Sequence, residues 1–255
     1  MEYIIYEVKD RIAYITINRP DKLNAINATG LDELYEVFTD FRDNPEAWVC
    51  IITGAGDKAF TSGHDLVDTS ESRARVKTTT GFDQLYVFVH HIWKPIIAAI
   101  NGYCIGGGSG VALAADIRIA VPGAAFLWPQ VKRGFSSISG PTLLAHKIPF
   151  GIAAEWMFTG DVIPVETAMK YGLVNRIVPR DQLMPAAQEM AENILANAPL
   201  PVRTIKEAAV RTFGWPLAER VRLASLLAGT LSASEDSKEG LRAFTEKRTP
   251  VWTGR

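Results

Sequence analysis

The sequence predicts an α/β fold followed by a helical C-terminal region. Up to about residue 180, short runs of β-branched and aliphatic residues alternate with segments of helical periodicity. This alternation is typical of parallel strands connected by helices. Beyond residue 180 the strand patterns stop, while helical patterns continue almost to the end of the chain. We therefore expect a core over residues 1–195 and a helical region over residues 196–255.

The expected strands are recognised by residue type. The first two are short runs rich in isoleucine, valine and tyrosine, and the next three are apolar runs bounded by polar or glycine-bearing segments. In chain order they cover residues 4–8, 12–17, 49–53, 96–100 and 117–121.

The expected helices of the core are recognised by spacing. After Thr29 the apolar residues Leu31, Leu34, Phe38 and Phe41 fall three or four apart, which gives a helix with one buried face. A second helix over 82–92 stops before Pro95, and a third covers residues 107–115.

Four helices are expected after the core, over residues 182–197, 202–212, 216–231 and 235–247. Within the third, Leu223, Leu226, Leu227 and Leu231 share one face. No strand follows that could cover this face, and an exposed apolar patch of this kind is usually buried in an interface. The sequence therefore predicts a homo-oligomer with closed symmetry.

Composition excludes several classes of protein. The formal net charge of −1 provides no broad field for nucleic acid or an anionic membrane, so any phosphate site must be local. No apolar run approaches the roughly 18 residues of a transmembrane helix, and the N-terminus lacks a signal-peptide pattern. The two cysteines form no disulfide framework, and no His/Cys/Asp/Glu spacing suggests a metal site. We expect a cytoplasmic protein.

Two glycine-bearing segments, over residues 62–66 and 101–108, each follow an expected strand and precede a possible helix start. Glycine lets backbone approach a ligand closely, and the first N–H groups of a helix have no internal acceptor. One N–H group from each segment could converge on a single oxygen atom as an oxyanion hole. The alternative is that these glycines only form turns and helix starts.

Several motifs occur in a characteristic order along the whole chain, over residues 18–26, 54–66, 94–108, 159–161, 172–175 and 239–248. In these motifs the chain resembles the crotonase (enoyl-CoA hydratase/isomerase) superfamily. The resemblance implies a crotonase-like spiral of ββα turns, an acyl-CoA-binding core and a C-terminal helical oligomerisation region. It also implies an acyl-CoA substrate, no cofactor apart from the coenzyme A of that substrate, and a trimer or a dimer of trimers.

The resemblance also implies functional residues. The oxyanion donors would be the backbone N–H groups of His64 and Gly107, the latter following Gly106, which would also meet the substrate. The remaining implied contacts to the substrate fall into three groups. At the adenine end of coenzyme A they are Lys22, Leu23 and Ala25, and along the pantetheine they are His64, Asp65, Leu66 and Val67. Phe244 and Lys247 would contact the coenzyme A phosphate of a neighbouring subunit. The alternative for Lys22 and Lys247 is surface solvation, and for Phe244 it is core packing.

One departure from the family pattern concerns the reaction. Hydratases of the family use two glutamates, whose positions here hold Gly110 and Gln130. A positioned general acid or base contributes about 10²–10⁴ in rate, so ordinary enoyl-CoA hydration is not expected. Gln130 could still hydrogen-bond a substrate carboxylate or carbonyl without adding charge, and Asp68 or Glu71 could supply a carboxylate from elsewhere.

The sequence thus predicts an acyl-CoA-transforming enzyme, a lyase or isomerase, that stabilises a thioester enolate. An alternative is an acyl-CoA decarboxylase or another enolate-forming lyase or hydrolase of the superfamily, in which water or the His64 imidazole supplies the proton. A further alternative is a non-catalytic acyl-CoA-binding paralogue.

Overall fold

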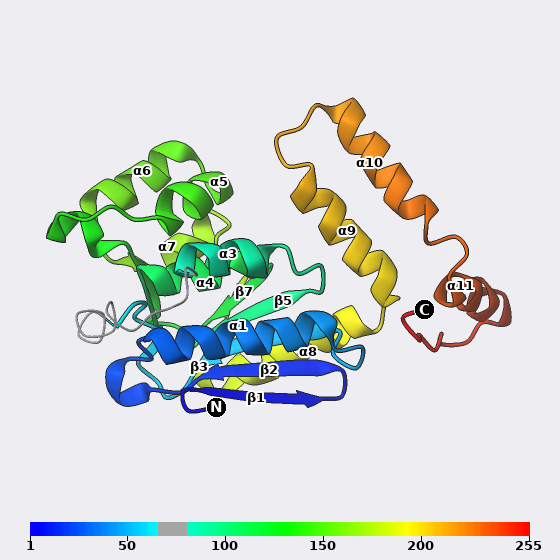
Figure 1. Cartoon of the computed structure of the whole chain (residues 1–255), viewed down its shortest axis with the longest axis horizontal. Helices are drawn as coiled ribbons and strands as arrows, with labels where there is room; N and C mark the ends of the chain where they lie inside the picture. The colour runs from blue at the N-terminus through cyan, green and yellow to red at the C-terminus, as the bar shows by residue number, and fades with distance from the viewer. Residues whose placement is uncertain (66–80) are drawn as a thin grey trace.

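The computed structural model describes residues 1–65 and 81–255 of the 255-residue chain (Figure 1). The strands are β1 (Ile4–Lys9), β2 (Ile12–Ile17), β3 (Val49–Gly54), β4 (Ala59–Thr61), β5 (Ile96–Ile100), β6 (Tyr103–Ile105), β7 (Ile117–Ala120), β8 (Ala125–Leu127), β9 (Ile163–Pro164) and β10 (Arg176–Ile177). The α-helices are α1 (Ala28–Asp43), α3 (Phe82–His90), α4 (Gly107–Ala114), α5 (Ala145–Lys147), α6 (Phe150–Thr159), α7 (Val165–Lys170), α8 (Leu183–Leu195), α9 (Pro199–Arg211), α10 (Leu217–Gly229) and α11 (Glu235–Glu246).

The strands form two separate sheets, and the chain crosses repeatedly from one sheet to the other. One sheet has the order β1-β2-β3-β5-β7-β10 and the other has the order β4-β6-β8-β9. Strands β3, β5 and β7 are parallel neighbours in the first sheet, and β4, β6 and β8 are parallel neighbours in the second. From β3 to β8, successive strands therefore alternate between the two sheets, so the chain advances as a spiral.

Burial explains why the first sheet is so apolar. Every residue of β5 is buried, as are five of the six residues of β3. Helix α8 packs on β3, β5 and β7, and α1 buries Leu34, Phe38 and Phe41 along one face, as their spacing predicted. Strands covered by helices read as continuous apolar runs, which is what the sequence showed at 49–53 and 96–100.

The α/β class and the helical C-terminal region are confirmed. The four C-terminal helices lie where periodicity placed them, with no strand after β10 in the described chain. Figure 1 shows α9 and α10 side by side, projecting from the sheets, with α11 beyond them at the far side of the molecule. The predicted division at 195/196 falls at the end of α8, and as a domain boundary it stays a prediction.

The second sheet was not anticipated. Its strands β4, β6 and β8 have three residues each, and β9 has two, so period-2 patterning has too few positions to be recognised. Within residues 1–65 and 81–255, no helix is long and apolar enough to cross a membrane.

Candidate active site

The carboxyl ends of three neighbouring strands define the candidate site. Because β4, β6 and β8 run parallel, the segments that follow them emerge at the same edge of the second sheet. After β4 comes Gly63-His64, after β6 comes Gly106 at the start of α4, and after β8 come Trp128 and Gln130. The second sheet thus brings together three segments that are far apart in the sequence.

Close backbone packing joins the first two segments. A Cβ atom on Gly63 would lie 2.7 Å from the Ile105 carbonyl oxygen and 3.0 Å from the Gly107 nitrogen. Gly63 also has a φ of +83°, a conformation that L side chains rarely adopt. Only glycine therefore allows the chain after β4 to pass against the first turn of α4. Gly107 opens that helix, so its N–H has no acceptor within the helix.

The direction of the His64 N–H follows from a short parallel bridge. The Ile26 N–H donates to the Gly63 carbonyl at 2.8 Å, and the Asp65 N–H donates to the Ile26 carbonyl at 3.0 Å. Backbone groups alternate in direction along an extended segment. The N–H of His64, between these two, therefore points away from Ile26.

An ion pair anchors the residue that follows His64. Arg19 Nη1 lies 3.0 Å from an Asp65 carboxylate oxygen and also donates to the Ala25 carbonyl at 2.8 Å. The side chains of Arg19 and Asp65 are 15% and 14% exposed, so water screens this pair only partly. Asp65 was predicted to lie along the pantetheine of coenzyme A. The ion pair holds its carboxylate to Arg19, beside the turn at residues 22–25 that was predicted to lie at the adenine end.

That turn has a strained backbone held by a buried amide. Leu23 and Asn24 have φ values of +52° and +56°, both in the left-handed region. The fully buried Asn24 side chain donates to the Ala59 and Ala55 carbonyls and accepts from the Arg19 N–H. The turn presents Lys22 and Leu23 to solvent and buries Ala25.

The His64 imidazole is surrounded unevenly. The residue is exposed, yet the protein around the ring removes enough hydration to lower its pKa below the ordinary 6.5. The negative charge of Asp83, in the first turn of α3, opposes this and raises the pKa. Asp83 is therefore a carboxylate that acts on His64, and sequence analysis did not single it out.

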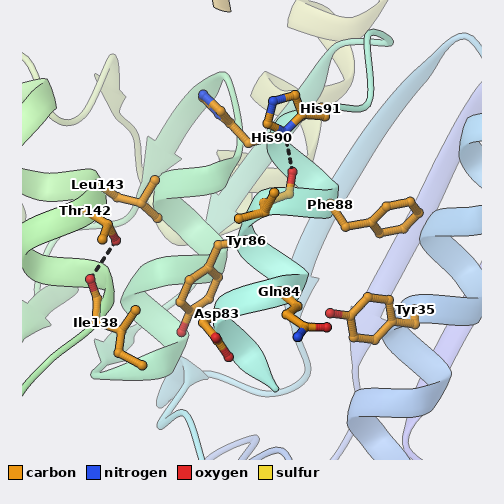
Figure 2. Close-up of a pocket in the computed structure, with 11 residues that line it drawn as sticks. Tyr35, Asp83, Gln84, Tyr86, Phe88, His90, His91, Ile138, Thr142 and Leu143 are labelled. Carbon is orange, nitrogen blue, oxygen red and sulfur yellow. Dashed lines mark hydrogen bonds between the residues drawn. The ribbon is translucent and has the colours of Figure 1, made fainter. Parts of the chain in front are cut away.

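An aromatic ring fills the space beside Gly110, the position predicted to correspond to the first hydratase glutamate. A Cβ on Gly110 would lie 2.6 Å from Cε1 and 2.7 Å from the hydroxyl oxygen of Tyr86. The Tyr86 hydroxyl donates to the Gly107 carbonyl at 2.8 Å. Burial, with the Asp83 charge, raises the pKa of Tyr86, so the hydroxyl stays protonated. Figure 2 shows Tyr86 and Asp83 projecting from α3.

Gln130 lies against Gly106, the residue that follows β6. Its Nε2 is 2.7 Å from the position that a Cβ on Gly106 would take, and Gly106 has a φ of +54°. The Oε1 atom of Gln130 is buried and has no hydrogen-bond partner in the described part of the chain. The glutamine therefore lies against the glycine that precedes Gly107, and its Oε1 atom is unsatisfied.

A groove of about 680 Å³ runs beside α3 (Figure 2). Tyr86, Val87 and Ile138 line it together with His90 and His91, and Tyr35 closes it from α1. Tyr86 lines this groove and also donates to the Gly107 carbonyl, so the groove adjoins the candidate site from the α3 side.

Two predicted residues lie far from the site of their own chain. Phe244, on α11, is 85% exposed, and Lys247 ends that helix at the surface. Figure 1 shows α11 well separated from α4. The exposure of Phe244 contradicts its alternative reading as a core residue. Leu66 and Val67, with the weaker candidates Asp68 and Glu71, lie outside the described residues.

Sequence analysis missed the residues that support the site from other elements. Tyr86 and Asp83 on α3, and Trp128 after β8, carry no motif that marks them as functional, and Arg19 lies in the motif over residues 18–26 but was given no role. Position 110 offered the one available signal, because a glycine inside a buried helix suggests that another group approaches closely. No group of three or more His, Cys, Asp or Glu able to hold a metal occurs within residues 1–65 and 81–255.

Known proteins share this fold and this sequence pattern. The family model described as "Enoyl-CoA hydratase/isomerase" matches residues 7–255, so the chain belongs to the enoyl-CoA hydratase/isomerase family. It is 38% identical over 253 residues to (E)-benzylidenesuccinyl-CoA hydratase of Thauera aromatica, covering 98% of this chain and 99% of that one. It is 41% identical over 253 residues to carnitinyl-CoA dehydratase of Escherichia coli K12, covering 96% and 95%.

Solved structures agree with this assignment. The crystal structure of an enoyl-CoA hydratase from Bacillus anthracis matches with a TM-score of 0.93 at 32% identity, over 99% of this chain and 100% of that chain. An enoyl-CoA hydratase from Mycobacterium tuberculosis H37Rv matches with a TM-score of 0.92 at 36% identity, over the full length of both chains. The predicted superfamily and crotonase-like fold are confirmed.

Proposed function

We propose that this chain is an acyl-CoA-transforming enzyme that holds the thioester oxygen between the backbone N–H groups of His64 and Gly107. The supporting observation is the contact between the two strand ends, where a Cβ on Gly63 would lie 3.0 Å from the Gly107 nitrogen. The His64 N–H faces away from Ile26, and the Gly107 N–H opens a helix. Two such donors stabilise an enolate oxygen, and each is worth about 3–4 kcal/mol in well-studied cases.

Family membership supports the thioester substrate, because the relatives are named as hydratases and dehydratases of CoA thioesters. In this proposal the turn at Lys22, Leu23 and Ala25 meets the adenine end of coenzyme A. Lys22 is exposed there, and a compact cation suits a phosphate.

The reaction differs from hydration by a glutamate pair. The position of one glutamate is Gly110, whose side-chain space the Tyr86 ring occupies, and the other is the uncharged Gln130. At neutral pH neither position supplies a carboxylate to move a proton to or from water. The candidate for proton transfer among the described residues is the His64 imidazole, whose pKa the Asp83 charge raises.

A second candidate reaction is decarboxylation of a malonyl-type thioester, which the uncharged side chains at positions 110 and 130 favour. The bond between the α-carbon and the carboxylate would break, CO₂ would leave, and the electron pair would form the thioester enolate. A proton from water or from His64 would then complete the α-carbon. A glutamate beside the substrate carboxylate would oppose its binding, whereas the Gln130 amide can donate to it.

The test is an assay of the purified protein against enoyl-, malonyl- and β-keto-acyl-CoA thioesters, with product identification and CoA binding measured in parallel. We expect turnover of at least one thioester. We also expect crotonyl-CoA hydration to be at least about 10³-fold slower than in a relative with both glutamates. Rapid crotonyl-CoA hydration would contradict the proposed reaction, and tight binding of every thioester without turnover would show a non-catalytic acyl-CoA-binding paralogue.

The proposal includes a closed homo-oligomer, a trimer or a dimer of trimers. Large apolar side chains are exposed along the C-terminal helices, including Ile205 at 69%, Leu226 at 67% and Leu241 at 71%. An oligomer would bury them. It would also carry Phe244 and Lys247 to the coenzyme A phosphate of a neighbouring subunit, since they lie far from their own site.

A further inference from the structure

A chain of buried hydrogen bonds leads to the peptide that carries the Gly107 N–H. The Trp128 indole Nε1 donates to the Ser139 hydroxyl at 3.2 Å, and this hydroxyl donates to the Gly106 carbonyl at 3.1 Å. Trp128 is 0% exposed and Ser139 is 2% exposed. Both side chains are shielded from bulk solvent, so these two hydrogen bonds lie in a low-dielectric part of the protein.

The chemistry of the three groups fixes the direction of each bond. An indole N–H only donates, a carbonyl only accepts, and a hydroxyl has one proton and two lone pairs. Ser139 must therefore accept from Trp128 and donate to Gly106. The Trp128 ring is held in place by stacking on Phe126, with 6.1 Å between the ring centroids and 8° between the planes.

The Gly106 carbonyl and the Gly107 N–H belong to one planar peptide group. A hydrogen bond donated to the carbonyl oxygen draws electron density through the amide and strengthens the N–H as a donor. The other hydrogen bond to this carbonyl, from the Gly110 N–H, is longer at 3.4 Å. Ser139 is thus its closer partner.

We infer that Ser139, oriented by Trp128, is a positioning residue of the oxyanion hole, which fixes and polarises the Gly106–Gly107 peptide toward the thioester oxygen. This inference rests on the proposed function, because it requires the Gly107 N–H to bind that oxygen. It assigns a role to two buried residues, Trp128 and Ser139, that act through the Gly106–Gly107 peptide. Cooperative strengthening of about 10–30% of one oxyanion interaction corresponds to about a 2- to 8-fold change in kcat.

Ser109 provides a matched control. It is fully buried in α4, three residues after Gly106, and its hydroxyl donates to the Cys104 carbonyl at 2.7 Å. Replacing Ser139 or Ser109 by alanine removes one buried hydroxyl in each case. Only Ser139→Ala removes the bond to the Gly106 carbonyl. A general packing effect would appear in both variants, whereas the proposed polarisation would appear in one.

The experiment measures the infrared stretching frequency of a thioester carbonyl labelled with ¹³C in butyryl-CoA, a saturated ligand that cannot be hydrated. We expect wild-type protein to lower the frequency relative to free ligand. Ser139→Ala should lose part of this shift, and Trp128→Phe, which keeps the stacked ring, should lose less. Ser109→Ala should retain the full shift. For the substrate found in the panel assay, kcat should fall about 2- to 8-fold in Ser139→Ala, with KM changed less.

Each alternative outcome has a separate meaning. If butyryl-CoA binds to wild-type protein without any shift, or does not bind, the proposed oxyanion hole is wrong. If wild-type protein shows the shift and Ser139→Ala retains it, the inference about Ser139 is overturned. An equal loss in Ser109→Ala also overturns it. If Ser139→Ala does not fold, Trp128→Phe decides the matter, because an unchanged shift there excludes orientation by the indole.

Discussion

Tyr86 and Gly110 share one space: a Cβ at position 110 would lie 2.6 Å from the Tyr86 Cε1 atom, and the Tyr86 hydroxyl bonds to the Gly107 carbonyl at 2.8 Å. Helix α3 thereby supplies a neutral phenol at the position where the family resemblance predicts a hydratase carboxylate. A glutamate at position 110 cannot be accommodated unless Tyr86 also changes.

The first prediction follows from this shared space. Gly110→Ala should destabilise the protein by about 1–3 kcal/mol, because the buried ring must move. In a Tyr86→Ala background the same change should be neutral or stabilising by up to about 1 kcal/mol, because alanine is favoured in a helix interior. Denaturant unfolding of the four proteins of this cycle measures the coupling. Equal effects of Gly110→Ala in both backgrounds would show that the two positions are independent.

The second prediction concerns the charge state of His64. Partial burial lowers its pKa below 6.5, and the Asp83 carboxylate raises it. Asp83→Asn should therefore lower the His64 pKa further, since a negative charge near the imidazolium is lost. An NMR titration of the His64 ring in both proteins checks this. A higher His64 pKa in the variant would show that Asp83 does not act on His64 as the structure indicates.

The third prediction links acid sensitivity to His90. Burial, followed by the nearby Lys147 charge, lowers the pKa of His90 to about 4. Between pH 6.5 and 4 the unfolded chain therefore binds a proton that the folded chain does not. Stability should fall as the pH falls through this window, by up to about 3 kcal/mol from this residue.

Unfolding by denaturant at pH 7 and pH 4.5 measures this effect, and His90→Gln is the comparison. Other groups also titrate in this range, so the difference between wild-type protein and the variant isolates His90. We expect the variant to lose less stability on acidification than wild-type protein. The same loss in both proteins would contradict the assignment.

The fourth prediction concerns assembly. Wild-type protein should sediment as a trimer or a hexamer. Leu226→Glu places a charge on a side chain that is 67% exposed in the isolated chain, so it should yield smaller species and weaken CoA binding. Lys247→Ala should weaken CoA binding while the assembly stays intact. A wild-type monomer that binds CoA tightly would contradict both the interface and the role of Lys247.

Much of the fold could be predicted from the sequence, because its patterns extend over several consecutive residues of one element. The periodicity of Leu34, Phe38 and Phe41 marked α1, and the continuous apolar runs marked β3 and β5. The spiral itself was not readable from these patterns. It depends on which strands pair across the two sheets, and the three-residue strands β4, β6 and β8 carry too little pattern to reveal this.

The site could be predicted only in part, because local sequence patterns do not show which elements pack together. Glycines at 63 and 106–108 mark close backbone approach within their own segments, and the family resemblance connected them. Tyr86, Asp83 and Ser139 reach the site from other elements, so their roles depend on tertiary packing. From the sequence alone, Tyr86 cannot be distinguished from an ordinary core tyrosine, because its contact with Gly110 depends on the packing of α3 on α4.

The central claim is tested most directly by a crystal structure of the protein with butyryl-CoA. We expect the thioester oxygen to lie about 2.7–3.1 Å from both the His64 and the Gly107 backbone nitrogens, the range for an oxyanion donor. His64→Ala should give the same position, because the donor is backbone. A thioester oxygen bound away from these two nitrogens would contradict the account.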